Sequence, residues 1–290
     1  MSTIQQYLSQ ITLPAEYSHK GQNGKLLIIG GSELFHAASK WSLDVASKFV
    51  DMVFYSSVPS NNELVHEAKK EFWNGIIVER KNIESYLQEA DAILIGPGME
   101  RGEYTELAER TALSDDEWNH DTAAVVQYLV AKYPQKKWVI DAGALQMIHP
   151  ELLNQNCIIT PHASELERLI HRYSETENDT QKTALQTLLQ TGCTVLLKGH
   201  VDYVYAGTEV VEITGGNPGM TKGGTGDVLA GLVAALFTQH SAVVSAVVGS
   251  YINKKSGEKL AESVGPFFNS SDLVDIIPRV LWEELQLLKK

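Results

Sequence analysis

The chain alternates short apolar runs with segments of helical apolar spacing, and this alternation limits its fold more than any other feature. Runs that are apolar at nearly every position predict strands buried on both faces, as in a parallel sheet covered by helices on each side. The predicted strands are residues 25–30, 52–57, 75–79, 91–96, 138–141, 157–160, 193–198, 201–207 and 209–214.

The segments between these strands predict the covering helices. They are residues 37–50, 63–72, 83–88, 122–132 and 181–190, with a further helix beginning near Ala163. The last three strands follow one another without a helix, which favours an antiparallel edge. We find no Pro- or Ser-rich linker and no internal repeat, and the polar loop 101–121 is short for a domain boundary. We therefore predict one α/β domain over residues 1–290, with three α/β/α layers and a mostly parallel central sheet.

Charge and hydropathy exclude two classes of partner. Lys and Arg number 24 and Asp and Glu 36, so the net charge is −12, which repels nucleic-acid backbones but permits a nucleotide in a local positive pocket. Residues 228–252 are the most apolar stretch, but Thr238, Gln239 and His240 interrupt it. Two buried helices meeting at a turn explain this stretch better than a membrane span.

The two cysteines and the N-terminus predict a cytoplasmic protein. Cys157 and Cys193 both lie in apolar runs, so we expect buried thiols rather than a disulfide or redox site. The first ten residues are polar and lack the apolar core of a signal peptide.

Unusual residues follow four of the predicted strands. They are Gly30-Gly31-Ser32, Gly96-Pro97-Gly98, Asp141 and Thr160-Pro161-His162. Each alone fits a turn or a helix cap. Together they predict a ligand site, because ligands of open α/β sheets bind at the carboxyl ends of the strands.

The segment NPGMTKGGTGDVLAG, residues 217–231, carries the strongest chemical signal. Glycines followed by a helix N-terminus direct backbone N–H groups inward and form an anion hole. Asp227, where the helix begins, is either an N-cap or a base that accepts a proton from a hydroxyl attacking a phosphate. Neither a Walker-type loop nor the GxGxxG dinucleotide fingerprint occurs.

The order of the motifs makes the resemblance specific. GGTGDVLAG resembles the GxGD signature of ribokinase-like kinases, and four further segments narrow the match to one branch: DAILIGPGM, WVIDAGAL, ITPHASELERL and LLKGHVDYV. With the opening LLIIGGSELFHAAS, they are similar to the ADP-dependent NAD(P)H-hydrate dehydratases over residues 25–236. The resemblance implies a ribokinase-like fold without the epimerase domain of bifunctional members, and cofactor repair in which the S epimer of NADH or NADPH hydrate is phosphorylated by ADP and then loses phosphate.

The resemblance also implies roles for individual residues. Asp227 would be the catalytic base, and Gly224, Thr225 and Gly226 would hold the transferred phosphoryl group. Ala37, Gly98 and His162 would face the hydrate, with His162 alternatively capping the next helix. Glu165 would hold the metal water of the fold, with Asp141 supporting the same Mg²⁺. The nucleotide would lie along Lys198, Gly199, His200, Val201 and Asp202.

Several positions depart from the family pattern. Glu100 replaces the third Gly of GPGLG, Gly143 the second Asp of DADAL, and His36 the Gly before Ala37. The helix after it lacks the family's small-residue pattern, and the carboxylate of Asp202 would repel a phosphate. Two alternatives therefore stay open: another kinase of this fold acting on a small hydroxylated vitamin precursor, and a non-catalytic nucleotide-binding protein. By resemblance we expect a homo-oligomer, a tetramer, to which residues 265–268 contribute an interface unless they are core.

Overall fold

A single mixed sheet organises the molecule. The computed structural model describes residues 3–102, 107–108, 110–171 and 181–289. Within them the sheet has nine strands in the order β3-β2-β1-β4-β5-β6-β7-β8-β9. The strands are β1 Lys25–Ile29, β2 Met52–Ser56, β3 Ile76–Ile77, β4 Ala92–Ile95, β5 Lys137–Ile140, β6 Cys157–Ile159, β7 Thr194–Leu197, β8 Asp202–Ala206 and β9 Glu209–Ile213.

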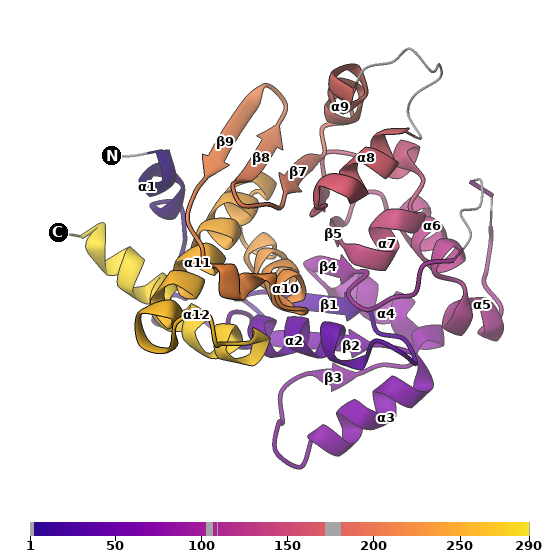
Figure 1. Cartoon of the computed structure of the whole chain (residues 1–290). Helices are drawn as coiled ribbons and strands as arrows, with labels where there is room; N and C mark the ends of the chain where they lie inside the picture. The colour runs from indigo at the N-terminus through magenta and orange to yellow at the C-terminus, as the bar shows by residue number, and fades with distance from the viewer. Residues whose placement is uncertain (1–2, 103–106, 109, 172–180, 290) are drawn as a thin grey trace.

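The pairing confirms the predicted fold class. Every pair from β3 through β7 is parallel, and β8 and β9 add antiparallel strands at one edge. Figure 1 shows the β8–β9 hairpin rising from this edge, with α1 and the C-terminal end of α12 on the same side of the molecule. The predicted strand over residues 75–79 is reduced to the two residues of β3.

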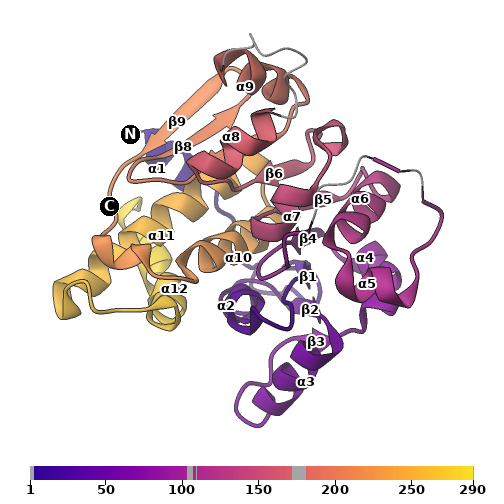
Figure 2. The same cartoon turned by 45° about the vertical axis from the view of Figure 1, so that its right-hand side comes forward.

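Helices cover both faces of the sheet, because alternate residues of each strand point to opposite sides. Leu26 and Ile28 of β1 join one core cluster, and Leu27 and Ile29 join the other. The first cluster lies under α1 Thr3–Leu8, α2 His36–Ala46, α3 Pro59–Ala68, α10 Thr225–Phe237, α11 Ala242–Val264 and α12 Ser270–Leu287. The second lies under α4 Ile83–Glu89, α5 Asp115–His120, α6 Thr122–Lys132, α7 Ala142–Met147, α8 Ala163–His171 and α9 Gln181–Gln190 (Figure 2).

Helices α1, α5, α7 and α12 lie outside the segments predicted as helices. Helix α5 falls inside the predicted loop 101–121 and begins at Ser114 with a capping box closed by Glu117. Helix α12 also begins with a capping box, between Asn269 and Asp272, and contains Pro278. The capping boxes mark where α5 and α12 begin, and such a cap contributes about 1 kcal/mol. Helix α12 also buries one apolar face with helical spacing, whereas α7 has no side-chain cap hydrogen bond.

The long apolar stretch forms two helices, as the sequence predicts. Helix α10 ends at Phe237 and α11 begins at Ala242, with Ser241 as its N-cap. Among the described residues, none of the helices combines the length and apolarity that a membrane crossing requires. The sequence leaves the stretch 265–268 as either an interface or core. Phe268 is buried and belongs to the core, whereas Phe267 is 85% exposed and is free to form an interface.

The turn after β4 requires glycine for both backbone conformation and space. Gly96 has φ 123°, and a Cβ there would lie 1.8 Å from the carbonyl oxygen of Asp141. The substitution Gly96→Ala is expected to lower the free energy of unfolding by more than about 1 kcal/mol. Urea denaturation measures this loss. Gly207→Ala is the matched control, because Gly207 has φ 60° with no atom within 4 Å of the added Cβ. Equal losses in the two variants would show that the Gly96 contact is unimportant.

Candidate functional site

Polar and charged side chains from the ends of three neighbouring strands meet at the carboxyl edge of the sheet. Lys198, just after β7, places Nζ 2.8 Å from Oδ1 of Asp141, just after β5. Thr160, after β6, donates its hydroxyl to the same oxygen at 2.8 Å. Burial favours the neutral amine of Lys198, but the negative charges of Asp141, Glu165 and Asp227 outweigh this and raise its pKa. Two of the predicted strand-end residues, Asp141 and Thr160, therefore lie in contact with each other, and Asp141 also contacts Lys198.

The glycine loop leads into the N-terminus of α10 at this same edge. Gly224 is the N-cap with φ 95°, a conformation that favours glycine. The first amides of any helix lack partners within the helix, and its N-terminus carries a partial positive charge. A Cβ at Gly226 would meet only Nζ of Lys198, at 3.7 Å. The space beside Gly226 is thus open to an anion near a lysine.

Two cavities lie on either side of this helix start. The first, of about 530 Å³, is bounded by Lys198, Gly199, His200 and Gly226, among others. The second, of about 560 Å³, is bounded by Gly98, Glu100, Gly143 and Asp227, among others. Among the described residues the two linings share no member, and consecutive residues Gly226 and Asp227 separate them. This arrangement fits one ligand in each cavity, with their reacting groups meeting at the start of α10.

Asp227 has the protonation behaviour of a base that works near neutral pH. Burial raises the pKa of its carboxyl to about 7, and the negative charge of Asp141 acts in the same direction. The positive charge of Lys198 opposes both effects. A base is most effective when its pKa lies near the working pH, so this environment suits proton transfer. The N-cap of α10 is Gly224, and Asp227 lies within the first turn of the helix instead.

A neighbouring lysine compensates the negative charge of the Asp202 carboxylate. It is buried and lies 3.2 Å from Nζ of Lys254, which comes from α11. Its two oxygens accept hydrogen bonds from the amide of Gly199 at 2.8 Å and the hydroxyl of Ser250 at 2.7 Å. Lys254 also donates to the carbonyl oxygens of Gly199 and His200. The pair therefore fixes the backbone of the predicted nucleotide segment, a role that sequence reasoning missed because Lys254 is remote in the chain.

The remaining predicted residues lie at this edge in different positions. His162 lines the first cavity rather than the second, and its Nδ1 accepts the amide of Glu165 at 3.3 Å, so it caps α8. Ala37 is exposed, and its neighbour Ala38 lines the second cavity instead. Val201 does not line the first cavity among the described residues. Thr225 directs its hydroxyl to the carbonyl oxygen of Met220 at 2.7 Å.

The departures from the family pattern have local structural contexts. A Cβ at Gly143 would lie 2.1 Å from the carbonyl oxygen of Met99, so this backbone cannot hold an aspartate there without moving. Glu100 is exposed at the rim of the second cavity, and His36 is exposed at the start of α2. Glycine therefore replaces the family's aspartate at position 143, where the backbones of two loops come close together.

The two residues predicted for Mg²⁺ lie close to the phosphate end of the site. Glu165 is buried and accepts the side-chain amide of Gln146 at 3.1 Å and the amide of His162 at 3.0 Å. Among the described residues, no three His, Cys, Asp or Glu side chains are grouped to hold a metal ion. Mg²⁺ usually keeps several waters and binds one or two carboxylates plus phosphates. Asp141 and Glu165 therefore fit a hydrated ion that arrives with a nucleotide, and this role stays a prediction.

Comparison with known proteins identifies the family. The sequence profile described as NAD(P)H-hydrate dehydratase matches residues 26–279. The chain belongs to this family. It is 31% identical over 278 residues to the ADP-dependent (S)-NAD(P)H-hydrate dehydratase of Cenarchaeum symbiosum, covering 91% of this chain and 90% of that one.

Further relatives differ in length or share only the fold. The chain is 33% identical over 271 residues to a bifunctional NAD(P)H-hydrate repair enzyme of Methanocaldococcus jannaschii, covering 91% of this chain but 49% of that protein. It thus spans about half the length of this relative. The ADP/ATP-dependent NAD(P)H-hydrate dehydratase of Bacillus subtilis, co-crystallised with ATP/Mg²⁺, superposes with a TM-score of 0.73 at 21% identity, covering 98% and 97% of the two chains. A ribokinase of Thermotoga maritima superposes with a TM-score of 0.55 at 14% identity, covering 88% and 99%. The fold is therefore ribokinase-like.

The charges around Asp227 predict opposite shifts in its titration. In the wild type, carboxyl ¹³C NMR should show Asp227 titrating near pH 7. Lys198→Met removes the positive charge that lowers this pKa, so the midpoint should move to higher pH. Asp141→Asn removes the negative charge that raises it, so the midpoint should move to lower pH. The signal is assigned by its loss in Asp227→Asn, and a wild-type midpoint near pH 4 would contradict the burial argument.

Proposed function

We propose that this protein is an ADP-dependent (S)-NAD(P)H-hydrate dehydratase that restores NADH or NADPH from the hydrated cofactor. The observation that carries the proposal is the position of Gly226 and Asp227 between the two cavities. ADP would occupy the cavity beside Lys198 and Gly199, and the hydrated nicotinamide the cavity beside Gly98. Membership of the family and the naming of the relatives from Cenarchaeum symbiosum and Nitrosopumilus maritimus support the same assignment.

The proposed reaction has two steps that share one site. Asp227 accepts the proton of the ring hydroxyl. The hydroxyl oxygen attacks the β-phosphorus of ADP, and AMP leaves. The amides at the start of α10 and the ammonium of Lys198 stabilise the charge on the transferred group. The ring nitrogen then expels phosphate by breaking the C–O bond, and the neighbouring ring carbon loses a proton to restore the dihydronicotinamide.

Charge neutralisation is the main help that phosphoryl transfer requires from a protein. In this proposal Glu165 and Asp141 would hold the hydrated Mg²⁺ that accompanies ADP, and the ion would supply positive charge to neutralise the phosphates. The buried carboxylates make the ion more necessary, since they repel an unscreened nucleotide.

We also propose that the enzyme acts in the cytoplasm as a homotetramer. The free, buried thiols of Cys157 and Cys193 are compatible with a reducing compartment. The exposed apolar side chains of Val264 and Phe267 are three residues apart in the chain and would be covered by a partner subunit. The tetramer follows the family resemblance.

Removal of the base should abolish chemistry while preserving nucleotide binding. Asp227→Asn is expected to reduce kcat by about 10²–10⁴-fold, the usual cost of losing a general base. ADP affinity should be equal to or higher than that of the wild type, because a negative charge near the phosphate is removed. The assay is recovery of NADH absorbance, with binding measured by calorimetry.

A charge-matched control accompanies this variant. Glu100→Gln removes one negative charge from the rim of the same cavity and should lose far less turnover than Asp227→Asn. Wild-type turnover in Asp227→Asn would eliminate Asp227 as the base.

The donor can be tested directly with matched concentrations of ADP and ATP on hydrated NADH and NADPH. ATP brings a further charged phosphate toward the position of the acceptor hydroxyl, so ADP with Mg²⁺ should give faster turnover and a chelator should stop it. Faster turnover with ATP would overturn the donor assignment. No turnover with either donor despite ADP binding would favour a non-catalytic nucleotide-binding protein.

A further inference from the structure

We infer that Trp41 is a positioning residue that holds the glycine loop of the anion hole in its working conformation. Trp41 lies on α2, the helix that lacks the family's small-residue pattern. Its indole contacts the glycine loop, which is distant in sequence, and hydrogen-bonds a residue of α12. The inference rests on the proposed function, because it concerns the loop that would receive the β-phosphate of ADP.

The indole ring lies directly against Gly224. A Cβ added to Gly224 would stand 2.3 Å from Cζ3 and 2.4 Å from Cε3 of Trp41. Since Gly224 has φ 95°, its peptide groups could rotate into other glycine conformations if this side were empty. The ring therefore restricts the glycine that serves as the N-cap of α10.

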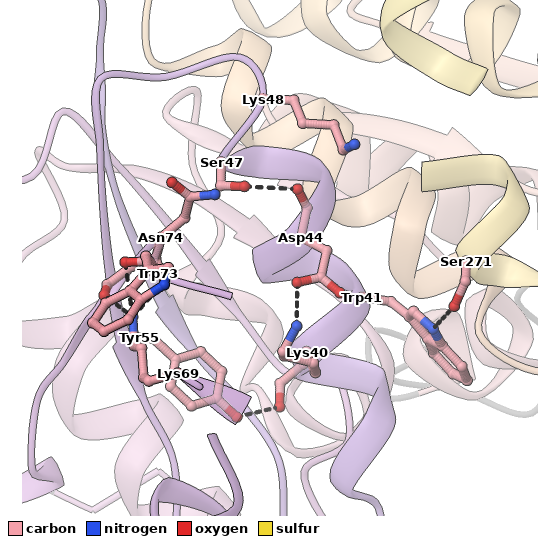
Figure 3. A network of polar contacts seen from close by, with 12 residues as sticks. Lys40, Trp41, Asp44, Ser47, Lys48, Tyr55, Lys69, Trp73, Asn74 and Ser271 are labelled. Atoms are coloured by element: carbon pink, nitrogen blue, oxygen red, sulfur yellow. Dashed lines mark hydrogen bonds and ion pairs between the residues drawn. The ribbon is translucent and has the colours of Figure 1, made fainter. Parts of the chain in front are cut away.

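A hydrogen bond fixes the ring itself. Nε1 of Trp41 donates to Oγ of Ser271, near the start of α12, at 3.2 Å, and Figure 3 shows the indole directed at this hydroxyl. The adjacent Ser270 donates its own hydroxyl to the carbonyl oxygen of Gly223 at 2.9 Å. The loop is thus held between α2 and the first turn of α12.

The same helix contacts both sides of the reaction site. Ser42 donates to the backbone carbonyl oxygen of Asp227 at 2.8 Å. Ser39 hydrogen-bonds the hydroxyl of Tyr55 at 2.8 Å and packs against Gly30 and Gly31, the turn that follows β1. On the side of α2 that faces Lys69 and Trp73, Lys40 pairs with Asp44 (Figure 3). Helix α2 is therefore anchored independently of Trp41, and the indole can be altered with limited effect elsewhere.

Electrostatic stabilisation of a transferred phosphate requires donors that are already in place. A displacement of about 1 Å in such a group can cost about 10²-fold in rate. Loss of the ring should therefore affect the β-phosphate and the transition state. It should not affect the nucleoside, which the distant Gly199 and His200 segment contacts in the proposed function.

The test compares ADP with AMP, which lacks the β-phosphate. Calorimetry with Mg²⁺ and turnover of hydrated NADH are measured for the wild type, Trp41→Ala, Trp41→Phe and Ser271→Ala. Trp41→Ala should lower kcat by about 10²-fold and weaken ADP binding, with AMP affinity unchanged. Trp41→Phe keeps a ring but not the N–H, so it should recover most of the loss and differ from the wild type by about 2- to 10-fold.

Two further variants sharpen the result. Ser271→Ala removes the same hydrogen bond from its other end, so the double variant with Trp41→Phe should be no worse than either single variant. Trp73→Phe is the control, because Trp73 is 79% exposed and belongs to another segment; it should behave as the wild type. These two tests remain informative if Trp41→Ala fails to fold.

Three results would overturn the inference. They are equal losses of ADP and AMP affinity in Trp41→Ala, a lower Tm with unchanged kcat in the folded fraction, and additive losses in the double variant. A wild type that binds ADP no more tightly than AMP and shows no turnover would instead refute the proposed function.

Discussion

The ion pair between Lys198 and Asp141 places two opposite charges close to Asp227. It joins the ends of β7 and β5, two strands separated in the sheet by β6, whose Thr160 donates to the same carboxylate. The pair is largely buried, and removing one partner of such a pair typically costs about 3–5 kcal/mol because the other charge is left uncompensated. The two charges also act on Asp227 in opposite directions. The order of the strands thus brings together two charges that act on the pKa of the proposed base.

A second buried pair shows how the chain accommodates a departure from its family. Asp202 would disfavour a phosphate if it were free, but Lys254 neutralises it and also binds the carbonyl oxygens of Gly199 and His200. Gly143 is a second departure that the fold explains, because the absence of a side chain lets the backbone of Met99 approach closely. Both departures are explained by neighbours in the fold, while the exposed positions of His36 and Glu100 have no such neighbour recorded among the described residues.

Helix α2 contacts the site through both small and large side chains. Its small residues Ser39 and Ser42 contact the turn after β1 and the backbone of Asp227, while Trp41 reaches the glycine loop. The helix therefore links the acceptor cavity to the phosphate end. A change in its sequence can alter the alignment of two ligands without touching either.

The sequence by itself determined the strands and most helices, and it predicted the chemistry of the glycine loop. These features are local: an apolar run predicts a strand and glycines before a helix predict an anion hole, whatever the rest of the chain does. It left the cap-initiated helices α5 and α12 undetected. Only the tertiary structure decided that Lys198 meets Asp141, 57 residues away in the chain, that Lys254 meets Asp202, and that Trp41 meets Gly224. The physical reason is that crossover connections and strand order bring these residues together, and neither is written in the local pattern of polar and apolar residues.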